Sequence, residues 1–416
     1  MAQLSDDAFA FGAPLLPLDE ALDLLRQRVA PVTGAETVSL VQAAGRVLDE
    51  DLAATISVPS FDNSAVDGYA VRHGDLAAQG PTCLPISSRL PAGSGSVAPI
   101  APGTVVRIFT GAPMPAGADT VFMQEDVRLE AGGVVLPAGL KVGANRRSAG
   151  EDFHAGRIAL ARCTRLDARG IAVHAALGLR EARVRRRLKV ALFSTGDEII
   201  APGLPLPPGG QYDSNRALLG ALLAARGAAV SDLGILADNR AAIIRALADA
   251  AESHDMILTS GGVSTGEEDH VKAAVEALGR LDFWRLALKP GRPVAMGAIR
   301  GAAFVGLPGN PVASFVTFVR FAGPLADHLS GGIMRLPQGF PVTADFRYAK
   351  KPGRREYVRA SLVETEAGPR LRKFPREGAA LLSSLAETDG LVELSEETTD
   401  IAPGAIVRFL PYALLM

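Results

Sequence analysis

The chain has 416 residues, of which 48% are hydrophobic, and its formal net charge is −2. A chain of this length exceeds one ordinary core, so we expect two to four domains. The near-zero charge, with no basic run apart from residues 183–189, argues against nucleic acid as the main partner. The two cysteines, Cys83 and Cys163, are too few for a disulfide framework or a cysteine-type zinc site.

The apolar segments are short or interrupted. The N-terminal residues show no basic region followed by an apolar core, which argues against a signal peptide. Arg226 and Arg320 interrupt the longest apolar runs before these reach the length of a membrane span. We therefore expect a soluble, cytoplasmic protein without a membrane partner.

The first part of the chain predicts a helix followed by β-rich structure. Residues 17–29 place Leu18, Leu22 and Leu25 on one helical face, and a second short helix is expected over residues 40–51. Short apolar runs separated by Pro and Gly then predict strands at residues 69–71, 105–109, 119–123 and 134–136. Residues 146–180 mix short strands and helical pieces.

From about residue 185 the pattern alternates between strands and helices. Strands are expected at residues 189–194, 230–236, 256–259, 284–288, 293–296 and 303–307. Helices are expected at residues 216–226, 239–252, 269–278 and 311–329. This alternation predicts a doubly wound, mostly parallel sheet with helices on both faces. Short alternating strands after residue 336 predict a small β-domain at the C-terminus.

Four polar or Gly-rich turns follow the expected strand ends, at residues 194–198, 237–239, 259–269 and 307–311. Ligands of open parallel sheets bind beyond the carboxyl ends of the strands, so we expect these turns to line one crevice. Gly261 and Gly262 let backbone N–H groups approach an anion, and the helix that follows adds its positive dipole end. A turn of this kind also occurs where close packing alone requires glycine.

Acidic residues in these turns are candidates for holding Mg²⁺ beside a phosphate. Glu198 and Asp269 have no simple structural role, whereas Asp238 could instead cap the following helix. Glu267 and Glu268 fall in the first turn of a helix, where acidic residues are common because of the helix dipole.

Lys289 and Arg292 are three residues apart in a turn stiffened by two prolines. If this turn joins two strands of one sheet, it forms a fixed clamp for an oxyanion.

In the earlier β-rich part, residues 62–67 combine Asp, Asn, Ser and Asp, and residues 109–119 form a second polar turn. Both fit ordinary turn chemistry, a second half-site or a dimer contact.

Taken together, these motifs resemble one family over nearly the whole chain. They are Phe61-Asp-Asn-Ser-Ala-Val-Asp-Gly-Tyr-Ala-Val, Thr110-Gly-Ala-Pro-Met-Pro, Gly150-Glu-Asp, Ser194-Thr-Gly-Asp-Glu, Tyr212-Asp-Ser-Asn, Ser260-Gly-Gly-Val-Ser, Lys289-Pro-Gly-Arg-Pro and Gly306-Leu-Pro-Gly-Asn-Pro. In this order they closely resemble molybdopterin molybdenumtransferase, the family of MoeA and the gephyrin E domain.

The resemblance implies an elongated, multidomain α/β plus β subunit that forms a homodimer. Its parts would be a discontinuous linker domain (1–54 and 146–184), a β-rich domain with the Asp-Asn-Ser motif (55–145), an α/β molybdopterin-binding domain (185–332) and a β-barrel-like domain (333–416). The α/β domain would be similar to molybdopterin adenylyltransferases, and such an enzyme is a candidate partner.

The implied reaction inserts molybdate into adenylylated molybdopterin, releases AMP and uses Mg²⁺. The site would lie between the α/β domain of one subunit and the Asp-Asn-Ser domain of the other. Catalysis and molybdate binding would involve Lys289, Arg292, Ser264, Asp62, Thr110, Arg359 and Ser383. Cofactor binding would involve Ser194, Thr195, Gly196, Gly261, Gly262, Pro308, Gly309, Asn310 and Pro311. The metal ligands would be Glu198, Asp238 and Asp269.

Some positions depart from the family pattern. Arg292 stands where Lys is frequent, and Ala313 stands where some members have Ser, so a hydroxyl ligand is not expected from that position.

Two other functions remain as alternatives: a molybdopterin adenylyltransferase and a non-catalytic, gephyrin-like scaffold. The Asp-Asn-Ser segment and the C-terminal β-domain argue against the first, and the acidic turns and Lys289 argue against the second.

Overall fold

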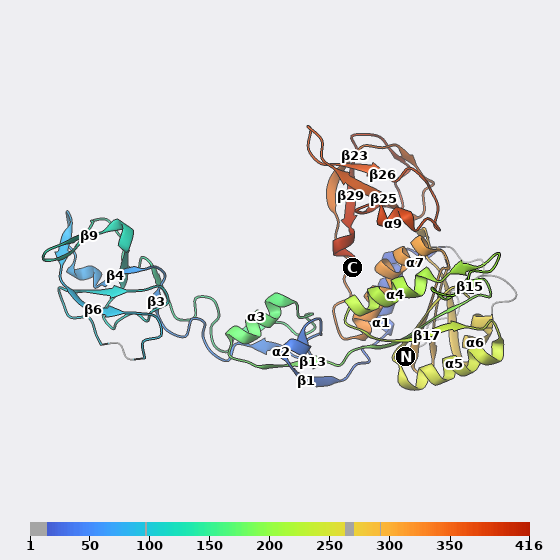
Figure 1. The fold of residues 1–416 in the computed structure, drawn as a ribbon, viewed down its shortest axis with the longest axis horizontal. Coiled ribbons are helices and arrows are strands. Elements are labelled where there is room, and N and C mark those ends of the chain that lie inside the picture. Colours follow the sequence, from blue (N-terminus) through green and yellow to red (C-terminus); the bar gives the residue numbers. More distant parts are fainter. Residues whose placement is uncertain (1–14, 96–97, 263–269, 292) are drawn as a thin grey trace.

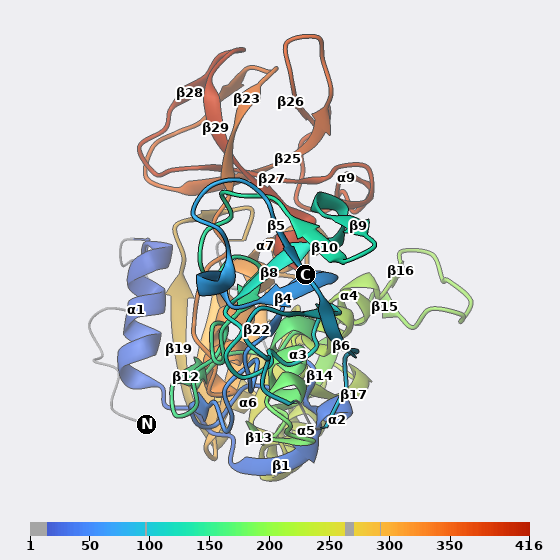
Figure 2. The same cartoon turned by 90° about the vertical axis from the view of Figure 1, so that its left-hand side faces the viewer.

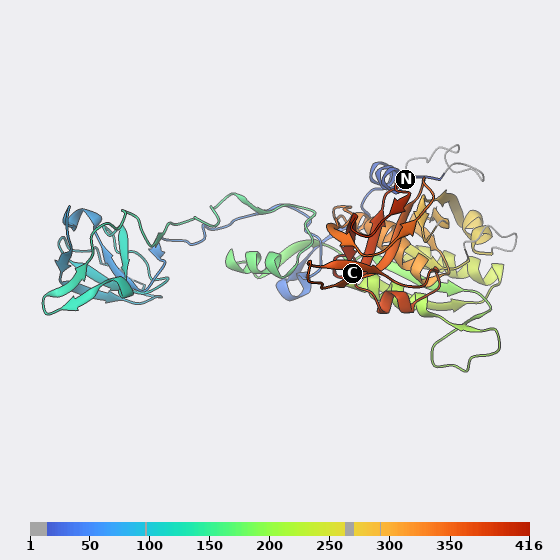
Figure 3. The ribbon, with the colours of Figure 1, turned by 90° about the horizontal axis from the view of Figure 1, so that it is seen from above.

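The computed structural model describes residues 15–95, 98–262, 270–291 and 293–416 and shows an elongated molecule (Figure 1). A β-rich lobe lies at one end, and a body formed by a helix-covered sheet and a barrel lies at the other. A narrow segment joins them, as the view from above also shows (Figure 3). None of the helices in the described ranges has the length and apolar character needed to span a membrane.

The distal lobe is built from short strands. β6 (Ile86–Leu90), β7 (Val105–Ile108), β4 (Gly68–Val71) and β8 (Thr120–Met123) form one sheet, and β5 (Thr82–Leu84), β10 (Gly133–Leu136) and β9 (Arg128–Glu130) form another. β3 (Asn63–Ser64) pairs with β11 (Arg146–Arg147), and short 3₁₀ turns η2 (His73–Asp75) and η3 (Gln124–Asp126) complete the lobe. Side chains of β4 alternate between two cores, with Ala70 in one and Tyr69 and Val71 in the other.

The connecting segment runs out to the lobe and back. β1 (Ala35–Ser39) pairs with β13 (Glu181–Arg185), β2 (Leu52–Ala53) pairs with β12 (Ile158–Leu160), and α3 (Ala168–Ala176) packs beside them. The helix expected over residues 40–51 is wrong, because α2 spans only Leu40–Ala43. Gly45 takes a positive φ of 75°, and Val47 and Leu48 then form β-bridges to the returning strand segments.

The central sheet has the strand order β17 (Ala229–Leu236), β14 (Lys189–Thr195), β18 (Met256–Ser260), β22 (Ala302–Leu307), β21 (Pro293–Ile299) and β19 (Gly279–Arg285). The first four strands are mutually parallel, and β21 runs antiparallel to both of its neighbours, β22 and β19. The expected doubly wound, mostly parallel sheet is therefore confirmed. The strand expected at residues 284–288 is instead split, since β19 ends at Arg285 and β20 (Leu288–Lys289) leaves the sheet.

Helices cover both faces of this sheet. The apolar residues of α1 (Leu18–Arg28), α4 (Ser214–Ala225) and the continuous stretch α7 (Pro311–Thr317), η4 (a π-helix, Phe318–Ala322) and α8 (Gly323–Leu329) share one core. Those of α5 (Arg240–Ser253) and α6 (His270–Leu278) form the core of the other face. β15 (Ile199–Ile200) and β16 (Gln211–Tyr212) form a small excursion between β14 and α4.

The C-terminal region is a closed barrel. β25 (Arg355–Val363), β26 (Arg370–Lys373), β23 (Phe340–Ala344), β29 (Ile406–Pro411) and β27 (Gly390–Leu394) follow one another, and β27 pairs back with β25. β24 (Tyr348–Ala349) pairs with β28 (Asp400–Ile401), and α9 (Ser383–Ala386) and η5 (Tyr412–Leu414) flank the barrel. Figures 1 and 2 both show the barrel beside the part of the sheet domain where α7 begins.

Candidate active site

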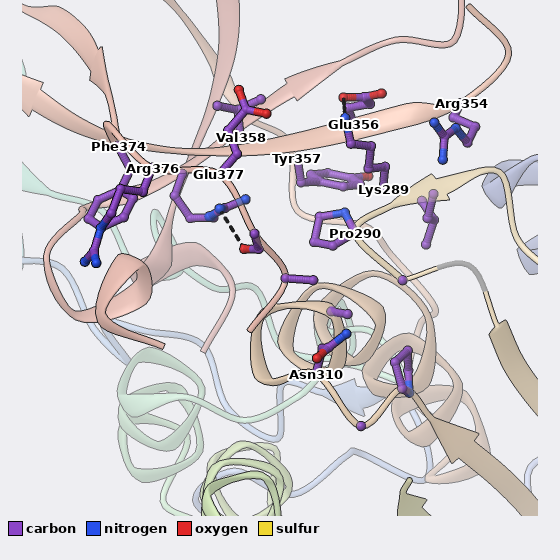
Figure 4. Close-up of a pocket in the computed structure, with 18 of the residues that line it drawn as sticks. Lys289, Pro290, Asn310, Arg354, Glu356, Tyr357, Val358, Phe374, Arg376 and Glu377 are labelled. Carbon is purple, nitrogen blue, oxygen red and sulfur yellow. Dashed lines mark hydrogen bonds and ion pairs between the residues drawn. The ribbon is translucent and has the colours of Figure 1, made fainter. Parts of the chain in front are cut away.

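A cavity of about 680 Å³ lies where the carboxyl ends of the central strands face the barrel. Gly261, Gly262, Pro308, Gly309 and Asn310 line it from the sheet. Lys289, Pro290 and Gly291 line it from the segment between sheet and barrel. The barrel contributes residues 354, 356–359, 373–374 and 376–379 among others. Figure 4 shows Lys289 and Pro290 between the barrel strand that carries Glu356 and the start of the helix next to Asn310.

Close packing at the ends of β18 and β22 requires glycine. Gly261 and Gly262 have φ angles of +85° and +65°, and a Cβ on Gly262 would lie 2.5 Å from the Thr195 side chain and 2.6 Å from that of Val271. The N–H of Gly261 donates to the carbonyl of Leu307 at 3.0 Å. The packing explanation for these glycines is thus correct, and the same packing brings the two turns together at the cavity wall.

Asn215, in the first turn of α4, forms hydrogen bonds to both the end of β18 and the turn that follows β22. Its Nδ2 donates to Ser260 Oγ at 2.7 Å and to the carbonyl of Gly309 at 2.6 Å, and the residue is buried. Its Oδ1 and the hydroxyls of Ser194 and Thr195 are buried without a hydrogen-bond partner among the described residues. Asn215 belongs to the Tyr212-Asp-Ser-Asn motif, and the sequence alone did not predict a role for it. Unpartnered buried polar atoms at a strand end are typical of a place where a ligand binds.

Lys289 lies in the cavity wall with its ammonium already paired. Nζ is 3.0 Å from Glu356 Oε2 and 3.3 Å from the hydroxyl of Tyr348, and the Lys289 side chain is 43% exposed. The expectation that its turn joins two strands of one sheet is wrong, because β20 pairs with β25 of the barrel. Glu356 and Tyr348 were missed from the sequence, since nothing nearby in the chain marks them as partners of Lys289.

Arg359 is a buried cation on β25. Nε donates to Ser384 Oγ and Nη2 to the carbonyl of Gly378, both at 3.1 Å, and the residue is 9% exposed. Burial lowers the pKa of the guanidinium, because no carboxylate forms an ion pair with it within the described part of the chain. The family resemblance implies Ser383 as a residue that reaches molybdate. Ser384 holds Arg359, whereas Ser383 Oγ accepts a hydrogen bond from the exposed Arg376 at 3.3 Å.

The proposed metal ligands that the structure describes are both exposed at strand ends. Glu198 follows β14 and Asp238 follows the neighbouring strand β17. The capping alternative for Asp238 is wrong, since Asn239 caps α5 by accepting from the N–H groups of Ala241 and Ala242. Within the described ranges, acidic, histidine and cysteine side chains form no group of three that could hold a metal ion.

Asp62 and Thr110 lie in the distal lobe, at the opposite end of the molecule from the sheet domain and the barrel whose residues line the cavity (Figure 1). Thr110 donates from its N–H and its hydroxyl to Asp67 Oδ1, at 2.8 and 2.7 Å, and these bonds lower the pKa of Asp67. Asp62 accepts from the N–H of Ala149 at 2.8 Å. A single chain therefore does not bring these residues to the cavity.

Three expected site residues, Ser264, Asp269 and Arg292, lie outside the described residues. The described lining also carries basic residues that no motif indicated. Together with Lys289 and Arg359, they give five basic side chains against two acidic ones: Lys289, Arg354, Arg359, Lys373 and Arg376 against Glu356 and Glu377. A cavity with this balance favours an anionic ligand.

Three family models match consecutive parts of the chain. They describe the MoeA N-terminal region, domains I and II (residues 16–178), a probable molybdopterin-binding domain (191–328) and the MoeA C-terminal region, domain IV (341–412). The fold and the cavity thus define a multidomain protein built around an α/β domain of the molybdopterin-binding type.

Full-length relatives identify the family. The chain is 37% identical to a molybdopterin molybdenumtransferase of Haemophilus influenzae, covering 97% of this chain and 100% of that protein. It is 36% identical to the Nostoc enzyme of the same name, covering 90% and 88%. A crystal structure of molybdopterin biosynthesis MoeA protein from Pyrococcus horikoshii OT3 superposes with a TM-score of 0.81 at 27% identity, covering 96% and 100%. The chain belongs to the MoeA family of molybdopterin molybdenumtransferases, a family of transferase enzymes.

Proposed function

We propose that this enzyme inserts molybdate into adenylylated molybdopterin, forms molybdenum cofactor and releases AMP with the help of Mg²⁺. The names of its relatives support the coarser reaction. The finer steps rest on the cavity between sheet and barrel, and above all on Arg359. They also rest on the family resemblance of the sequence motifs.

The burial of Arg359 beside the cavity, with hydrogen bonds only to neutral oxygens among the described residues, is the observation that carries the proposal. A buried guanidinium without a carboxylate partner is costly in the empty protein, and an oxyanion in the adjoining cavity would compensate it. Molybdate is a tetrahedral dianion with only acceptor oxygens, so fixed cations and N–H donors suit it. Its binding needs no protein nucleophile.

The size of the cavity supports a second, larger ligand. Its volume of about 680 Å³ far exceeds that of one small oxyanion, since a water molecule takes about 30 Å³. It falls within the range of about 300–1,000 Å³ that is usual for organic ligands. We assign this remaining space to the pterin, held by the turns that contain Gly261, Gly262 and residues 308–310.

The other residues divide into positioning and charge roles. Lys289 and Arg292 would bind the oxyanion together with Arg359, and Ser264 would add a hydroxyl. Ser384 orients Arg359 by accepting a hydrogen bond from its Nε. Ser383 would contact molybdate. The pterin supplies the sulfur ligands of molybdenum, so Cys83 and Cys163 take no part. Cys83 lies in β5 of the distal lobe.

The donor set fits Mg²⁺ bound together with a phosphate. Mg²⁺ at such sites uses one or two protein carboxylates, and Glu198 and Asp238 follow adjacent parallel strands at the cavity end of the sheet. Asp269 would be the third ligand. When bound, the ion would neutralise negative charge as the phosphoanhydride breaks.

We further propose that the active site is completed across a homodimer. Asp62 and Thr110 of one subunit would reach the cavity of the other, because within one chain they lie at the far end of the molecule. The corresponding division is a linker domain (1–54 and 146–184), a distal β-domain (55–145), the α/β domain (185–332) and the barrel domain (333–416). A molybdopterin adenylyltransferase would be the partner that supplies the adenylylated substrate.

A turnover assay tests the reaction. Purified protein is incubated with adenylylated molybdopterin and Mg²⁺, with and without molybdate, and AMP and molybdenum cofactor are measured. We expect AMP release that depends on molybdate and stops when the metal is chelated. AMP release that is independent of molybdate, or none at all, would overturn the proposed function.

A further inference from the structure

Lys289, Glu356 and Tyr348 form a closed hydrogen-bonded triangle at the cavity wall. Lys289 Nζ is 3.0 Å from Glu356 Oε2 and 3.3 Å from the Tyr348 hydroxyl, and that hydroxyl donates to the same Oε2 at 2.7 Å. Lys289 Nζ also lies 5.8 Å from the centre of the Tyr348 ring. All three residues line the cavity.

Glu356 is the fixed member of this triangle. It is only 1% exposed, whereas the Lys289 side chain is 43% exposed and has four rotatable bonds. The β25 backbone holds Glu356, and the buried Tyr348 holds its carboxylate through a short hydrogen bond. Burial and the neighbouring Glu356 raise the pKa of Tyr348, so its hydroxyl stays protonated and can donate.

The triangle joins two parts of the molecule. Lys289 comes from the segment that leaves the central sheet, and Glu356 comes from the barrel. The two residues are register partners where β20 pairs with β25. The location of the Lys289 ammonium is therefore set by the barrel as well as by its own turn.

We propose that Glu356, together with Tyr348, is a positioning residue that acts through Lys289. An ammonium has three N–H donors. Two are used within the triangle, and the restraint directs the third at an oxyanion in the cavity. This inference rests on the proposed function, because it concerns how that same site presents Lys289 to molybdate.

The effect of Glu356 on rate and on molybdate affinity should differ in sign. Its negative charge repels a dianion, so removing the charge favours molybdate binding, while removing the restraint makes a productive geometry less frequent. Glu356→Gln keeps the size of the side chain and removes the charge. Tyr348→Phe removes one hydroxyl and leaves every charge in place.

Steady-state AMP release at varied molybdate concentration tests the proposal, with correct folding checked by circular dichroism. We expect kcat to fall about tenfold in both variants, which corresponds to regained rotamer freedom of one lysine. The molybdate KM should fall or stay unchanged in Glu356→Gln and stay within about twofold in Tyr348→Phe. Glu252→Gln is the control, since Glu252 forms an exposed ion pair with Arg300 and does not line the cavity. We expect its kcat to remain unchanged.

A double-mutant cycle then asks whether Glu356 acts through Lys289. Rates are measured with enzyme in excess, so that about one ten-thousandth of the wild-type rate is detectable. Lys289→Ala combined with Glu356→Gln should be no slower than Lys289→Ala alone. A further tenfold loss in the double variant, or unchanged kcat in both single variants while the wild type is active, would overturn the inference. A wild type without AMP release would instead count against the proposed function.

Discussion

At the level of single residues, the two cations of the cavity differ in how their charge is compensated. Lys289 is half exposed and is paired with a buried carboxylate, whereas Arg359 is almost fully buried and bonds only to neutral oxygens in the described part of the chain. Arg359 therefore has more to gain from an incoming anion. The sequence motif instead indicated Lys289 as the more important cation, because Lys289 lies in the conspicuous proline-rich turn.

Replacement of Arg359 tests this difference. Arg359→Met should raise the molybdate KM about 100-fold, because charge-assisted hydrogen bonds from the guanidinium are lost. Without ligand, the variant should melt at the wild-type temperature or above it, since a buried uncompensated cation is removed. Differential scanning fluorimetry with and without molybdate measures the second effect. Arg372→Ala, an exposed change on the adjacent strand, is the control.

Replacement of Lys289 should have the opposite effect on stability. Lys289→Ala leaves Glu356 buried with Tyr348 as its remaining partner, and we expect unfolding free energy to fall by about 1–2 kcal/mol, less than for a fully buried pair because Lys289 is half exposed. Adding Glu356→Gln should recover most of the loss. Urea unfolding of the four proteins measures the effect. A double variant no more stable than Lys289→Ala alone would contradict it.

The sequence predicted Lys289 and Arg359 and missed Glu356 and Tyr348. Lys289 stands in a turn whose spacing indicates a clamp, and Arg359 was expected only from the family resemblance. Glu356 is 67 residues away from Lys289 in the chain, and the two meet only because β20 joins the barrel. A local pattern carries no information about such a pairing.

At the level of elements, the π-helix in the α7–α8 stretch links the sheet domain to the barrel. It places the buried Arg320 so that Nε donates to the Tyr357 hydroxyl and Nη2 to Glu393 Oε1, both at 2.9 Å. Tyr357 and Glu393 belong to β25 and β27 of the barrel. This network fixes the strand that carries Glu356 and Arg359 against the sheet domain.

Removing Arg320 should loosen this link. Arg320→Met removes the buried cation from Glu393, which keeps its hydrogen bond from Tyr357, so we expect unfolding free energy to fall by about 3 kcal/mol. Glu252→Gln, which breaks the exposed pair with Arg300, should change it by less than about 0.5 kcal/mol. Urea denaturation followed by circular dichroism compares the two. Equal effects would show that the Arg320 network contributes nothing beyond a surface ion pair.

Asp255, directly before β18, forms hydrogen bonds with Arg186 and with Lys189 at the beginning of β14. Burial alone would raise the pKa of this carboxylate, but hydrogen bonds from Arg186 at 2.6 and 2.8 Å and from the N–H of Lys189 at 2.9 Å outweigh burial and lower it. A folded-state pKa below the unfolded value contributes stability above about pH 4, and this contribution is lost as the pH falls through the folded-state pKa.

Asp255→Asn should therefore destabilise the protein in a pH-dependent way. We expect a loss of about 1–2 kcal/mol at pH 7 and a shrinking difference from wild type below about pH 4. Thermal melts from pH 3 to pH 8 measure it. A difference that is constant across this range would show that the charge of Asp255 is not responsible.

Helices and strands with strong periodicity were predicted well, and their ends and partners were not. The amphipathic pattern of residues 17–29 matches α1, and the alternation after residue 185 gave the central sheet. The helix expected over residues 40–51 fails where Gly45 turns the backbone and Val47 and Leu48 find partners in the returning segment. Pairing with distant segments, and not local pattern, determines the conformation of such short segments.

At the level of the whole molecule, the distal lobe and the cavity are separated within one chain (Figures 1 and 3). The motif with Asp62 and the cavity with Lys289 therefore meet only if a second subunit contributes the lobe. The sequence left three interpretations of this motif open: ordinary turn chemistry, a second half-site or a dimer contact. The position of the lobe follows from the narrow two-way connection, whose strands carry no pattern that reveals its length.

Subunit complementation tests the shared site. Asp62→Ala and Lys289→Ala each remove one half of every site, so both proteins should be inactive. A mixed dimer retains one intact site, and random re-association should restore about a quarter of the wild-type activity. AMP release by the co-expressed variants measures it. No recovery, in a preparation shown to contain mixed dimers, would contradict a site shared between subunits.

Anomalous diffraction at the molybdenum absorption edge tests most directly whether the cavity between sheet and barrel receives the oxyanion. Crystals soaked with molybdate should show a molybdenum peak in this cavity, within hydrogen-bonding reach of the Arg359 guanidinium and the Lys289 ammonium. A dominant peak elsewhere on the protein, with the cavity unoccupied at saturating molybdate, would contradict this placement.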